Sequence, residues 1–396
     1  MTAAFAAWFA AHRDEFIALR RDLHAHPELA FAENRTAAIV ADRLEAWGLK
    51  VTRGVARTGV VATLHGGPAA AIGLRADMDA LPMQEANGFA HRSTIPGVMH
   101  ACGHDGHTVI LLAAARYLSE TATALSGPIH FIFQPAEENE GGGRAMVEDG
   151  LFERFPVAAV FGLHNAPGIE VGHIHVRGGP ITAGFDVFDF VVRAQGGHGA
   201  WPARGGDAIT AAAALATQLP GIVSRHIDAA DSVVLAVTRI EGGTAYNILP
   251  TEVRVSGSVR WFSHAAQGEI RRRLEMHRQG LTLSYGVEVE LDYQCRYPPV
   301  INDNDAAQVA IGAARAWAGE DQVITEFAPV MGSEDFAFML EARPGAYLLL
   351  GNGAGEGGCH VHSPRYDFND EAIVHGAGLW VTLCQRFFTD QGTSAD

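Results

Sequence analysis

The chain has 396 residues, of which 48% are hydrophobic, and this is enough for two or three domains with buried cores. Its 29 Lys and Arg residues against 45 Asp and Glu residues leave a formal net charge of -16. Such a charge repels phosphate backbones and anionic lipid, which excludes a nucleic-acid partner and a membrane-surface partner. Lys50 is the only lysine, so the chain has no P-loop and no other side chain for a Schiff base.

The N-terminus and the cysteines predict a cytoplasmic protein. The first residues lack a basic stretch, and His12, Arg13 and Asp14 interrupt their apolar run too early for a secretory signal. The chain has no uncharged apolar run of about 18 residues, so we expect no transmembrane helix. The four cysteines form no CxxC motif, a pattern typical of a reducing compartment.

The first half of the chain alternates helical and strand-like patterns, which indicates a mostly parallel sheet covered by helices. The spacing predicts helices over 34–47 and 108–118 and strands over 60–67, 70–79, 129–133 and 157–163. Polar residues follow the strand ends: Asp77, Asp79, Glu137, Glu138, His164 and Asn165. Because ligands of open α/β sheets bind at the carboxyl ends of the strands, we expect these loops to converge.

Around residue 180 the pattern changes to strands of alternating polarity, predicted over 185–196, 232–243, 252–262 and 287–297. From about residue 296 the first style resumes, with a helix over 306–319, a strand over 346–353 and a closing helix from Asp370 to about Phe388. We therefore predict an α/β fold with a discontinuous domain, residues 1–181 and 296–396, interrupted by an inserted α+β domain, residues 182–295.

Thiolate, imidazole and carboxylate side chains gather in the motifs that hold Cys102, His104, Glu137, Glu138, His164 and His362. These are the groups that Zn, Mn, Co and Ni take from proteins, and they are numerous enough for a two-metal centre. A single such histidine is more often a hydrogen-bonded core or surface residue. Their shared position at strand ends beside glycines favours the functional interpretation.

Glu137 and Glu138 are adjacent, and neighbours in extended chain point to opposite sides. One carboxylate could then bind metal while the other faces the substrate water. The second carboxylate would be the base that metal-assisted hydrolysis requires. The simpler interpretation is a solvated acidic turn. The strand and the Gln134-Pro135 pair that precede it favour the functional one.

Other catalytic signals are weaker. The spacing Gly353-x-Gly355-x-x-Gly358 matches a dinucleotide fingerprint, but the residues after it hold a proline and do not open a helix. Neither GxSxG nor HExxH occurs, which argues against a serine hydrolase and the common zinc-protease helix. Cys102 with a nearby histidine could also be a nucleophile and its base, but the acidic groups would then have no role.

Ten segments resemble, in order and over nearly the full length, the dinuclear-metal aminoacylase/hippurate hydrolase family of amidohydrolases. They are RRDLHAHPELAFAE, LRADMDALPM, MHACGHDGHT, FIFQPAEENEGGGRAM, GLHN, GGHGAWP, GTAYNILP, GSVRWF, GSEDFAFM and VHSPRYDFND. This family includes N-acyl-amino-acid and auxin-conjugate hydrolases and is related to metallo-carboxypeptidases. The resemblance implies a catalytic domain interrupted by a smaller lid domain that also mediates dimerisation.

The resemblance also implies roles for single residues. The ligands of two divalent ions (Mn, Zn, Ni or Co) become Cys102, His104, Glu138, His164 and His362. Glu137 becomes the general base, and His198 would polarise the scissile carbonyl from its own or the partner subunit. Asn247 and Arg260 would hold the carboxylate of the substrate. The simpler alternatives are a surface histidine, a turn-forming asparagine and a solvent-facing arginine.

The sequence departs from the family pattern at two places. Ala203 follows Pro202 where the family often has a histidine, with Trp201 before it, so the shape of the acyl pocket is open. His360 stands where a methionine is common. The expected function is a metal-dependent, homodimeric amidohydrolase that cleaves N-acyl amino acids. The alternatives are a dipeptidase or metallo-carboxypeptidase on the same centre, and a non-catalytic protein that binds metal or a conjugate.

Overall fold

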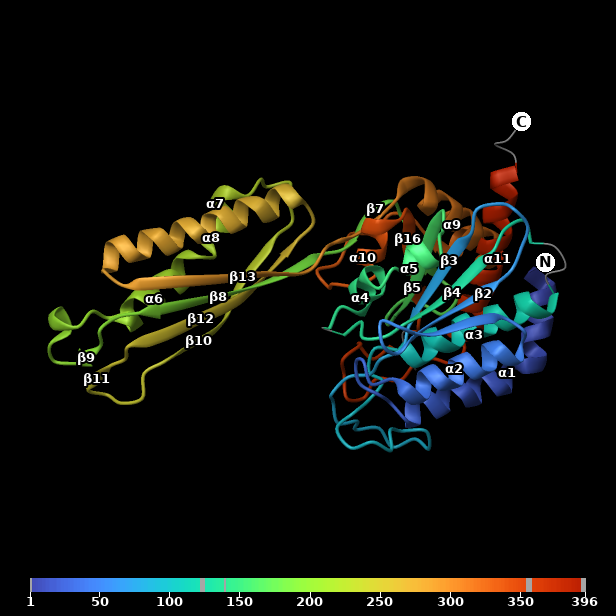
Figure 1. The fold of residues 1–396 in the computed structure, drawn as a ribbon, viewed down its shortest axis with the longest axis horizontal. Coiled ribbons are helices and arrows are strands. Elements are labelled where there is room, and N and C mark those ends of the chain that lie inside the picture. Colours follow the sequence, from blue (N-terminus) through green and yellow to red (C-terminus); the bar gives the residue numbers. More distant parts are fainter. Residues whose placement is uncertain (1, 122–124, 139, 354–357, 393–396) are drawn as a thin grey trace. The chain divides into compact units, whose positions relative to one another are not determined.

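The computed structural model describes residues 2–121, 125–138, 140–353 and 358–392, so Gly355 of the glycine-rich motif lies outside the described residues. The chain forms two compact units (Figure 1). The first comprises Met1–Ile181, Ile301–Ala328 and Asp335–Asp396, and the second Thr182–Val300 and Pro329–Glu334. The second unit thus runs past residue 295 and takes in a short segment that the sequence analysis left with the surrounding domain.

An eight-stranded sheet forms the centre of the first unit, in the order β1-β2-β4-β3-β5-β16-β6-β15. The strands are β1 (Lys50–Val55), β2 (Gly59–Leu64), β3 (Ile72–Asp77), β4 (Ile129–Gln134), β5 (Ala159–Ala166), β6 (Ile174–His175), β15 (Val323–Ile324) and β16 (Gly345–Gly351). The four central strands β4, β3, β5 and β16 are parallel, whereas β1, β2 and the β16-β6 pair are antiparallel. The predicted α/β class with a mostly parallel sheet is confirmed.

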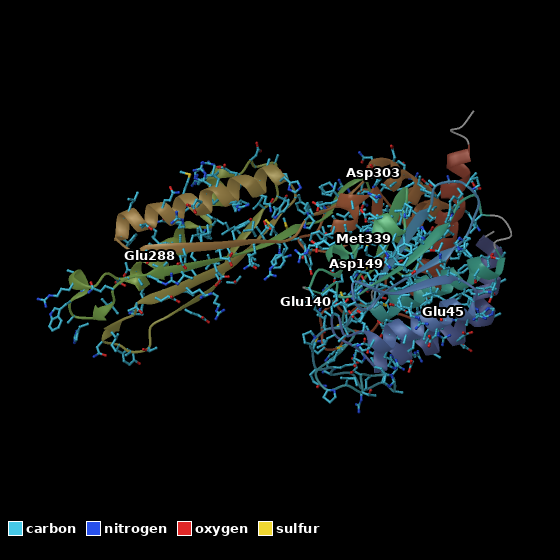
Figure 2. The ribbon with its side chains drawn as sticks, in the orientation of Figure 1. Glu45, Glu140, Asp149, Glu288, Asp303 and Met339 are labelled. Atoms are coloured by element: carbon cyan, nitrogen blue, oxygen red, sulfur yellow. The ribbon has the colours of Figure 1, made fainter. Side chains whose placement is uncertain are left out.

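Helices cover this sheet and share its core. They are α1 (Thr2–Ala25), α2 (Asn34–Ala46), α3 (His104–Thr121), α4 (Gly142–Glu148), α5 (Leu151–Arg154), α9 (Asn304–Ala318), α10 (Ala337–Ala342) and α11 (Ala372–Gly392). The helix α3 contacts β3, β4 and β5 and packs between α1 and α11. Asp303, labelled in Figure 2, caps α9 by accepting a hydrogen bond from the N–H of Ala306 (2.9 Å).

The central strands are buried on both faces because helices or loops cover both sides. All six residues of β3 and all six of β4 are buried. The helix α3 is buried around most of its circumference as well. The polar side chains that follow these strands therefore stand on a rigid base.

A four-stranded antiparallel sheet, β10-β12-β8-β13, forms the second unit. Its strands are β8 (Gly184–Arg193), β10 (Val234–Gly242), β12 (Glu252–Trp261) and β13 (Glu288–Tyr297), and its helices are α6 (Ala208–Gln218), α7 (Gly221–His226) and α8 (His264–Tyr285). Along β8 and β12 buried residues alternate with more exposed ones, as expected when helices cover one face only. Its core is separate from that of the first unit.

Two small sheets complete the structure. The strands β9 (Gly197–His198) and β11 (Ile248–Leu249) pair in the second unit, and β7 (Gly179–Thr182) pairs with β14 (Val300–Asn302) where the chain passes between the units. Short 3-10 turns occur at Pro202–Arg204 and Glu320–Gln322. Within the described residues, no helix has the length and apolar character needed to cross a bilayer.

Candidate metal centre

The loop that carries Cys102 turns sharply into α3, which begins at His104. Gly103 between them has a φ of 95°, a conformation that favours glycine. A Cβ atom there would lie 2.3 Å from the Asn165 side-chain nitrogen and 2.5 Å from the Tyr366 hydroxyl. Asn165 in turn donates a hydrogen bond to the Cys102 carbonyl (2.6 Å). The glycine thus lets the end of β5 approach the start of α3.

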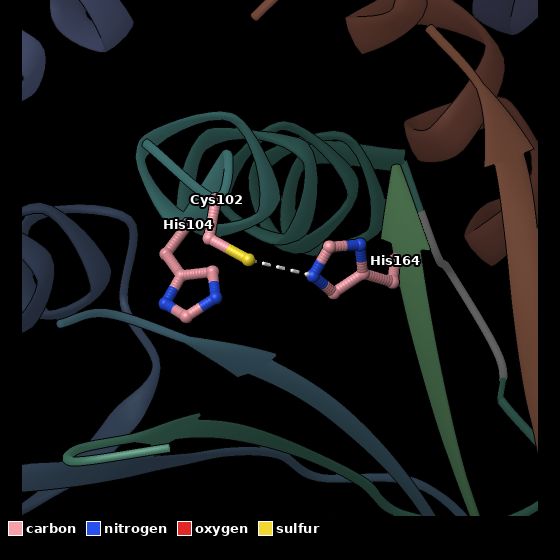
Figure 3. A group of neighbouring side chains, drawn as sticks. All are labelled: Cys102, His104 and His164. Atoms are coloured by element: carbon pink, nitrogen blue, oxygen red, sulfur yellow. Dashed lines mark hydrogen bonds between the residues drawn. The ribbon is translucent and has the colours of Figure 1, made fainter. Parts of the chain in front are cut away.

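This approach brings together the first group of candidate ligands, Cys102, His104 and His164. One ligand atom from each lies within 4.8 Å of the others, and Cys102 Sγ is 3.3 Å from His164 Nε2. In Figure 3 the thiol points toward the imidazole of His164, with His104 beside it. The His164 Nδ1 atom is 2.7 Å from the Asn165 carbonyl, so Nδ1 carries the proton and Nε2 presents a lone pair toward the thiol.

A second group shares Cys102 and adds Glu138 and His362, again with ligand atoms within 4.8 Å of one another. His362 Nε2 lies 3.1 Å from Glu138 Oε1. The backbone of His362 has a φ of 63°, a strained conformation for this residue type. Its N–H donates to the Ala101 carbonyl (2.7 Å), which fixes this distant segment beside the Cys102 loop. Cys102 therefore belongs to both candidate ligand groups.

Glu137 and Glu138 do not follow the expected extended geometry. Ala136 before them has a φ of 54°, and Glu137, Glu138 and His104 each place a ligand atom within 4.8 Å of the others. Both carboxylates therefore have an oxygen near His104, while Glu138 also lies with Cys102 and His362. The left-handed turn at Ala136 precedes the pair, so the alternation of side chains along an extended strand does not describe it. Which of the two carboxylates binds metal and which acts as the base stays a prediction.

Two buried carboxylates accept hydrogen bonds from the backbone of this turn. The N–H groups of Glu137 and Glu138 donate to the two oxygens of Asp79, each at 3.0 Å. The N–H of Ala136 donates to Glu33 Oε1 (2.8 Å), whose other oxygen accepts the Thr58 hydroxyl (2.5 Å). Asp79 was expected near the site from its place after a strand, but its hydrogen bonds to this turn and the part played by Glu33 were not predicted. Only the position of Glu33 within the HPELAFAE segment could have drawn attention to it.

His107 lies next to the centre but has no free nitrogen. Its Nδ1 lies 2.6 Å from Asp77 Oδ1, and its Nε2 accepts a hydrogen bond from the Asn165 N–H (2.9 Å). Asp77 also accepts from the fully buried Arg75 (2.7 Å). Asp77 and His107 therefore form a supporting layer that orients the ligand-bearing segments.

The chemistry of the donor set fits divalent cations. His104 Nε2 is buried without a hydrogen bond, while its Nδ1 lies 3.3 Å from Asp79 Oδ1, the arrangement of a metal-binding imidazole backed by a carboxylate. In spite of burial, Asp77 and Asp79 raise the pKa of His104 to about 10, so without a metal a proton takes the place of the cation. Burial and the nearby Glu138 raise the pKa of the Cys102 thiol well above its usual range, so the thiolate requires a cation.

The second unit holds the other three predicted residues. His198 pairs with Ile248 across β9 and β11, and the Asn247 carbonyl accepts the N–H of Gly199 (2.8 Å), so His198 and Asn247 are neighbours. Both are exposed. His198 Nδ1 accepts the N–H of Ala200 (3.1 Å), which leaves the proton of the neutral ring on Nε2.

Arg260 lies elsewhere in the second unit. It stands near the end of β12, eight residues after Glu252, whereas β11 lies just before the start of this strand. At about 3.4 Å per residue, the stretch of β12 from Glu252 to Arg260 is roughly 27 Å long, and His198 and Asn247 belong to the β9-β11 pair at its far end. The guanidinium lies over the ring of Phe185 (3.9 Å) and donates to the Ser333 hydroxyl (2.9 Å), and burial lowers its pKa. The structure does not bring Arg260 and Asn247 of one chain together.

Comparisons with known proteins agree with this geometry. Residues 73–386 match the family described as "Peptidase family M20/M25/M40". The chain is 36% identical to a hippurate hydrolase from Campylobacter jejuni, over 94% of this chain and 96% of that protein. It is 42% identical to an N-acyl-L-amino acid amidohydrolase from Geobacillus stearothermophilus, over 73% and 78% of the two chains. A dinuclear metal-binding M20 peptidase from Bacillus subtilis superposes with a TM-score of 0.84, at 32% identity over 96% and 99% of the chains.

The fold and the family together define a hydrolase. The chain belongs to peptidase family M20/M25/M40, and the resemblance drawn from its motifs is confirmed.

Proposed function

We propose that the protein hydrolyses the amide bond of N-acyl amino acids to a carboxylic acid and a free amino acid. The observation that carries this proposal is the junction of two candidate ligand groups at Cys102, with the carboxylate of Glu137 reaching the same site. The names of the relatives, a hippurate hydrolase and an N-acyl-L-amino acid amidohydrolase, support this class of substrate.

In this proposal the ligands are Cys102, His104, Glu138, His164 and His362. Two divalent ions held there would lower the pKa of water at the site and polarise the amide carbonyl. Thiolate, imidazole and carboxylate together fit Mn, Zn, Ni or Co. Among the ligands, the partly exposed His164 has a pKa well below the usual range, because desolvation of its ring and the nearby His107 both disfavour the charged form. It therefore keeps a lone pair available at neutral pH.

Glu137 acts as the general base and then as the general acid. Its carboxylate takes one proton from water while the oxygen forms a bond to the carbonyl carbon, and it returns that proton to nitrogen as the C–N bond breaks. The hydrogen bonds from Glu137 and Glu138 to Asp79 hold the backbone of this turn, so the carboxylate can stay at one position through both proton transfers.

His198 stabilises negative charge on the carbonyl oxygen in this mechanism. Its Nδ1 is occupied by the Ala200 N–H, so the neutral imidazole presents Nε2–H as a donor. A donor aimed at the developing oxyanion contributes to the rate because its interaction is stronger in the transition state.

We propose that the active enzyme is a homodimer formed through the inserted domain. A small substrate cannot touch both His198 and Arg260 of one chain, because roughly 27 Å of β12 separates them. If Arg260 binds the substrate carboxylate, the His198 and Asn247 side chains that act on the same molecule come from the partner subunit. The fully exposed Tyr246 and the exposed Ile248 beside them support a covered surface. Light scattering tests this, and a monomeric active enzyme would contradict it.

We also propose a cytoplasmic location, which the four free cysteines support.

The experiment that tests the function is amine release from a panel of N-acyl amino acids. The panel contains N-benzoylglycine, N-acetyl amino acids and unmodified dipeptides, each with added Mn or Zn and with a chelator. Turnover of the acylated compounds that disappears with the chelator is the expected result. Preference for free dipeptides would favour a dipeptidase or carboxypeptidase. Absence of turnover with metal bound would favour a binding protein, and activity that alkylation but not chelation abolishes would favour a Cys102 nucleophile.

A further inference from the structure

A cavity of about 640 Å³ opens in the first unit at the edge of the sheet opposite the metal centre. It is lined by Ala71, Pro128 and Ala158, which directly precede the parallel strands β3, β4 and β5. The metal-centre loops follow the other ends of these strands, about 20 Å away for six residues. We call it the strand-start cavity. Its volume is typical of a small-molecule site, in the range of about 300–1,000 Å³.

The floor of the strand-start cavity is a row of polar side chains across three neighbouring strands. Lys50 on β1 pairs with Thr63 on β2, and Thr63 pairs with His130 on β4. Directly paired residues share one face of a sheet, and all three line the cavity. The Thr63 hydroxyl lies 2.9 Å from His130 Nδ1. Thr52, two residues after Lys50, lines the same cavity.

The charges around the strand-start cavity are all of one sign. Lys50 and Arg154 line it, and none of the described residues in its lining is Asp or Glu. In a chain with a net charge of -16 this is an unusual concentration, and it includes the only lysine. Arg154 is partly neutralised by Asp149, labelled in Figure 2, at 3.2 Å. Burial and the nearby His65 lower the pKa of His130 to about 4, so this ring is neutral at pH 7.

The remaining lining is apolar and held in place by close backbone contacts. Phe155, Pro128 and Val157 supply the hydrophobic wall. The adjoining loop is fixed by backbone hydrogen bonds, because the Gly67 and Ala69 N–H groups donate to the 125–126 backbone (2.7 and 2.8 Å). It also packs closely at Gly66, where a Cβ atom would lie 2.1 Å from the Gly127 carbonyl oxygen. The cavity is therefore preformed, which lowers the entropy cost of binding.

We propose that the strand-start cavity binds small monoanionic carboxylates that have an apolar or aromatic body. The ammonium of Lys50 and the remaining charge of Arg154 match one carboxylate better than a dianionic phosphate. The hydroxyls of Thr52 and Thr63 add hydrogen-bond partners, and the wall around Phe155 accepts an aromatic ring. This site is separate from the metal centre and does not depend on the reaction proposed above.

The single lysine provides a local probe. Reductive methylation with ¹³C-formaldehyde labels only Lys50 and the α-amino group and keeps the positive charge, so one side-chain NMR signal reports on the cavity. The full-length enzyme is titrated with benzoate, with neutral benzamide and with inorganic phosphate, both with metal bound and after chelation. We expect a saturable shift of the Lys50 signal with benzoate in both states, and a smaller response to phosphate and benzamide.

Arg154→Ala should raise the benzoate concentration at half-saturation about tenfold, because it removes a charge-assisted hydrogen bond to the carboxylate and leaves the negative charge of Asp149 without its arginine. Arg193→Ala is the matched control: it removes an exposed, ion-paired arginine of the second unit and should leave the titration unchanged. A linear shift without saturation, an equal response to benzamide, or an Arg154→Ala titration identical to wild type would each overturn the proposal.

Discussion

The two units of the protein differ in where their paired charged side chains lie. The first unit buries arginine, histidine and carboxylate side chains in its interior, among them Arg20, Arg75 and Asp77. The second unit keeps its ion pairs at the surface, as at Arg193 and Glu252. The second unit is an amphipathic sheet with helices on one face, and apolar burial is enough to stabilise it.

The difference shows which part of the chain is organised around chemistry. Buried ion pairs add little net stability compared with apolar residues of the same volume, so their concentration around the metal centre reflects positioning. Arg20 contacts Asp105, Asp367 and Asp370, and these acids adjoin the segments that carry His104 and His362. The buried ion pairs of the first unit thus hold the segments that carry the candidate ligands in position.

Among changes in the first unit, we expect the largest effect on activity from replacing the proposed general base, Glu137. Glu137→Gln keeps the shape of the side chain but removes its proton-accepting charge, so kcat/KM should fall about 10²- to 10⁴-fold. Metal content, measured by elemental analysis of the purified variant, should stay at the wild-type level. Full activity in this variant would refute the assignment of Glu137 as the base.

A buried cation of the first unit should matter far more for stability than a surface cation of the second. Arg20→Met removes the buried cation that three carboxylates share and leaves them only their weaker partners His24, His91 and Arg21, so the free energy of unfolding should fall by about 3–5 kcal/mol. Arg193→Ala breaks two exposed pairs and should leave the denaturation midpoint almost unchanged. Urea unfolding of both variants measures this contrast, and equal effects would remove the distinction between the units.

The carboxylate beneath the Glu137 turn gives the next smaller effect. Asp79→Asn replaces one of two acceptors with a donor that faces a backbone N–H, and kcat should fall about 10- to 100-fold. The matched control is Asp207→Asn, because Asp207 also accepts a backbone N–H, from Thr210 (3.0 Å), and asparagine caps a helix equally well. If both variants keep full activity, the hydrogen bonds that Asp79 accepts from the turn are not needed for catalysis.

The smallest effect concerns the one buried acid that lies within the core sheet of the second unit. Burial raises the pKa of Asp186 above its usual 3.8, although Tyr293 (2.6 Å), Gln267 (2.7 Å) and Trp261 (2.9 Å) donate to it. A raised folded-state pKa means that this stability contribution is full below the unfolded-state pKa and is lost as the pH rises through the folded-state value.

Relative to Asp186→Asn, the wild-type second unit should therefore gain stability as the pH is lowered from 7 toward 4. Hydrogen exchange of the β8 and β12 amides in both proteins measures this locally. A difference between the two proteins that does not vary with pH would show that the pKa of Asp186 is not raised.

The sequence predicted the elements more completely than their arrangement. The periodicity of residues 129–133 and 157–163 and their apolar character placed β4 and β5 closely. The sheet order was not accessible, because the pairing of β16 with both β5 and β6 joins segments that are far apart in the chain and carries no local signal.

The site divides in the same way. Motifs such as CGHDGH identified side chains that the fold brings together, because the type of a residue determines whether its side chain can bind a metal. The turn at Ala136 and its support by Glu33 depend on backbone geometry, and an alanine with positive φ has no sequence signature. The separation of Asn247 and Arg260 along β12 was likewise hidden, because motifs do not encode distance.

The place of β16 in the sheet has a consequence for biosynthesis. This strand lies between β5 and β6, yet roughly 180 residues separate it from β5, which is about ten to forty seconds of translation at typical rates. Until Gly345–Gly351 leaves the ribosome, the neighbouring strand edges have no partner from this part of the chain. The inserted unit is synthesised during this interval, so the nascent enzyme holds an open apolar sheet edge while its second core already forms. Newly made chains are therefore most vulnerable to aggregation in the interval between the synthesis of β5 and the emergence of Gly345–Gly351.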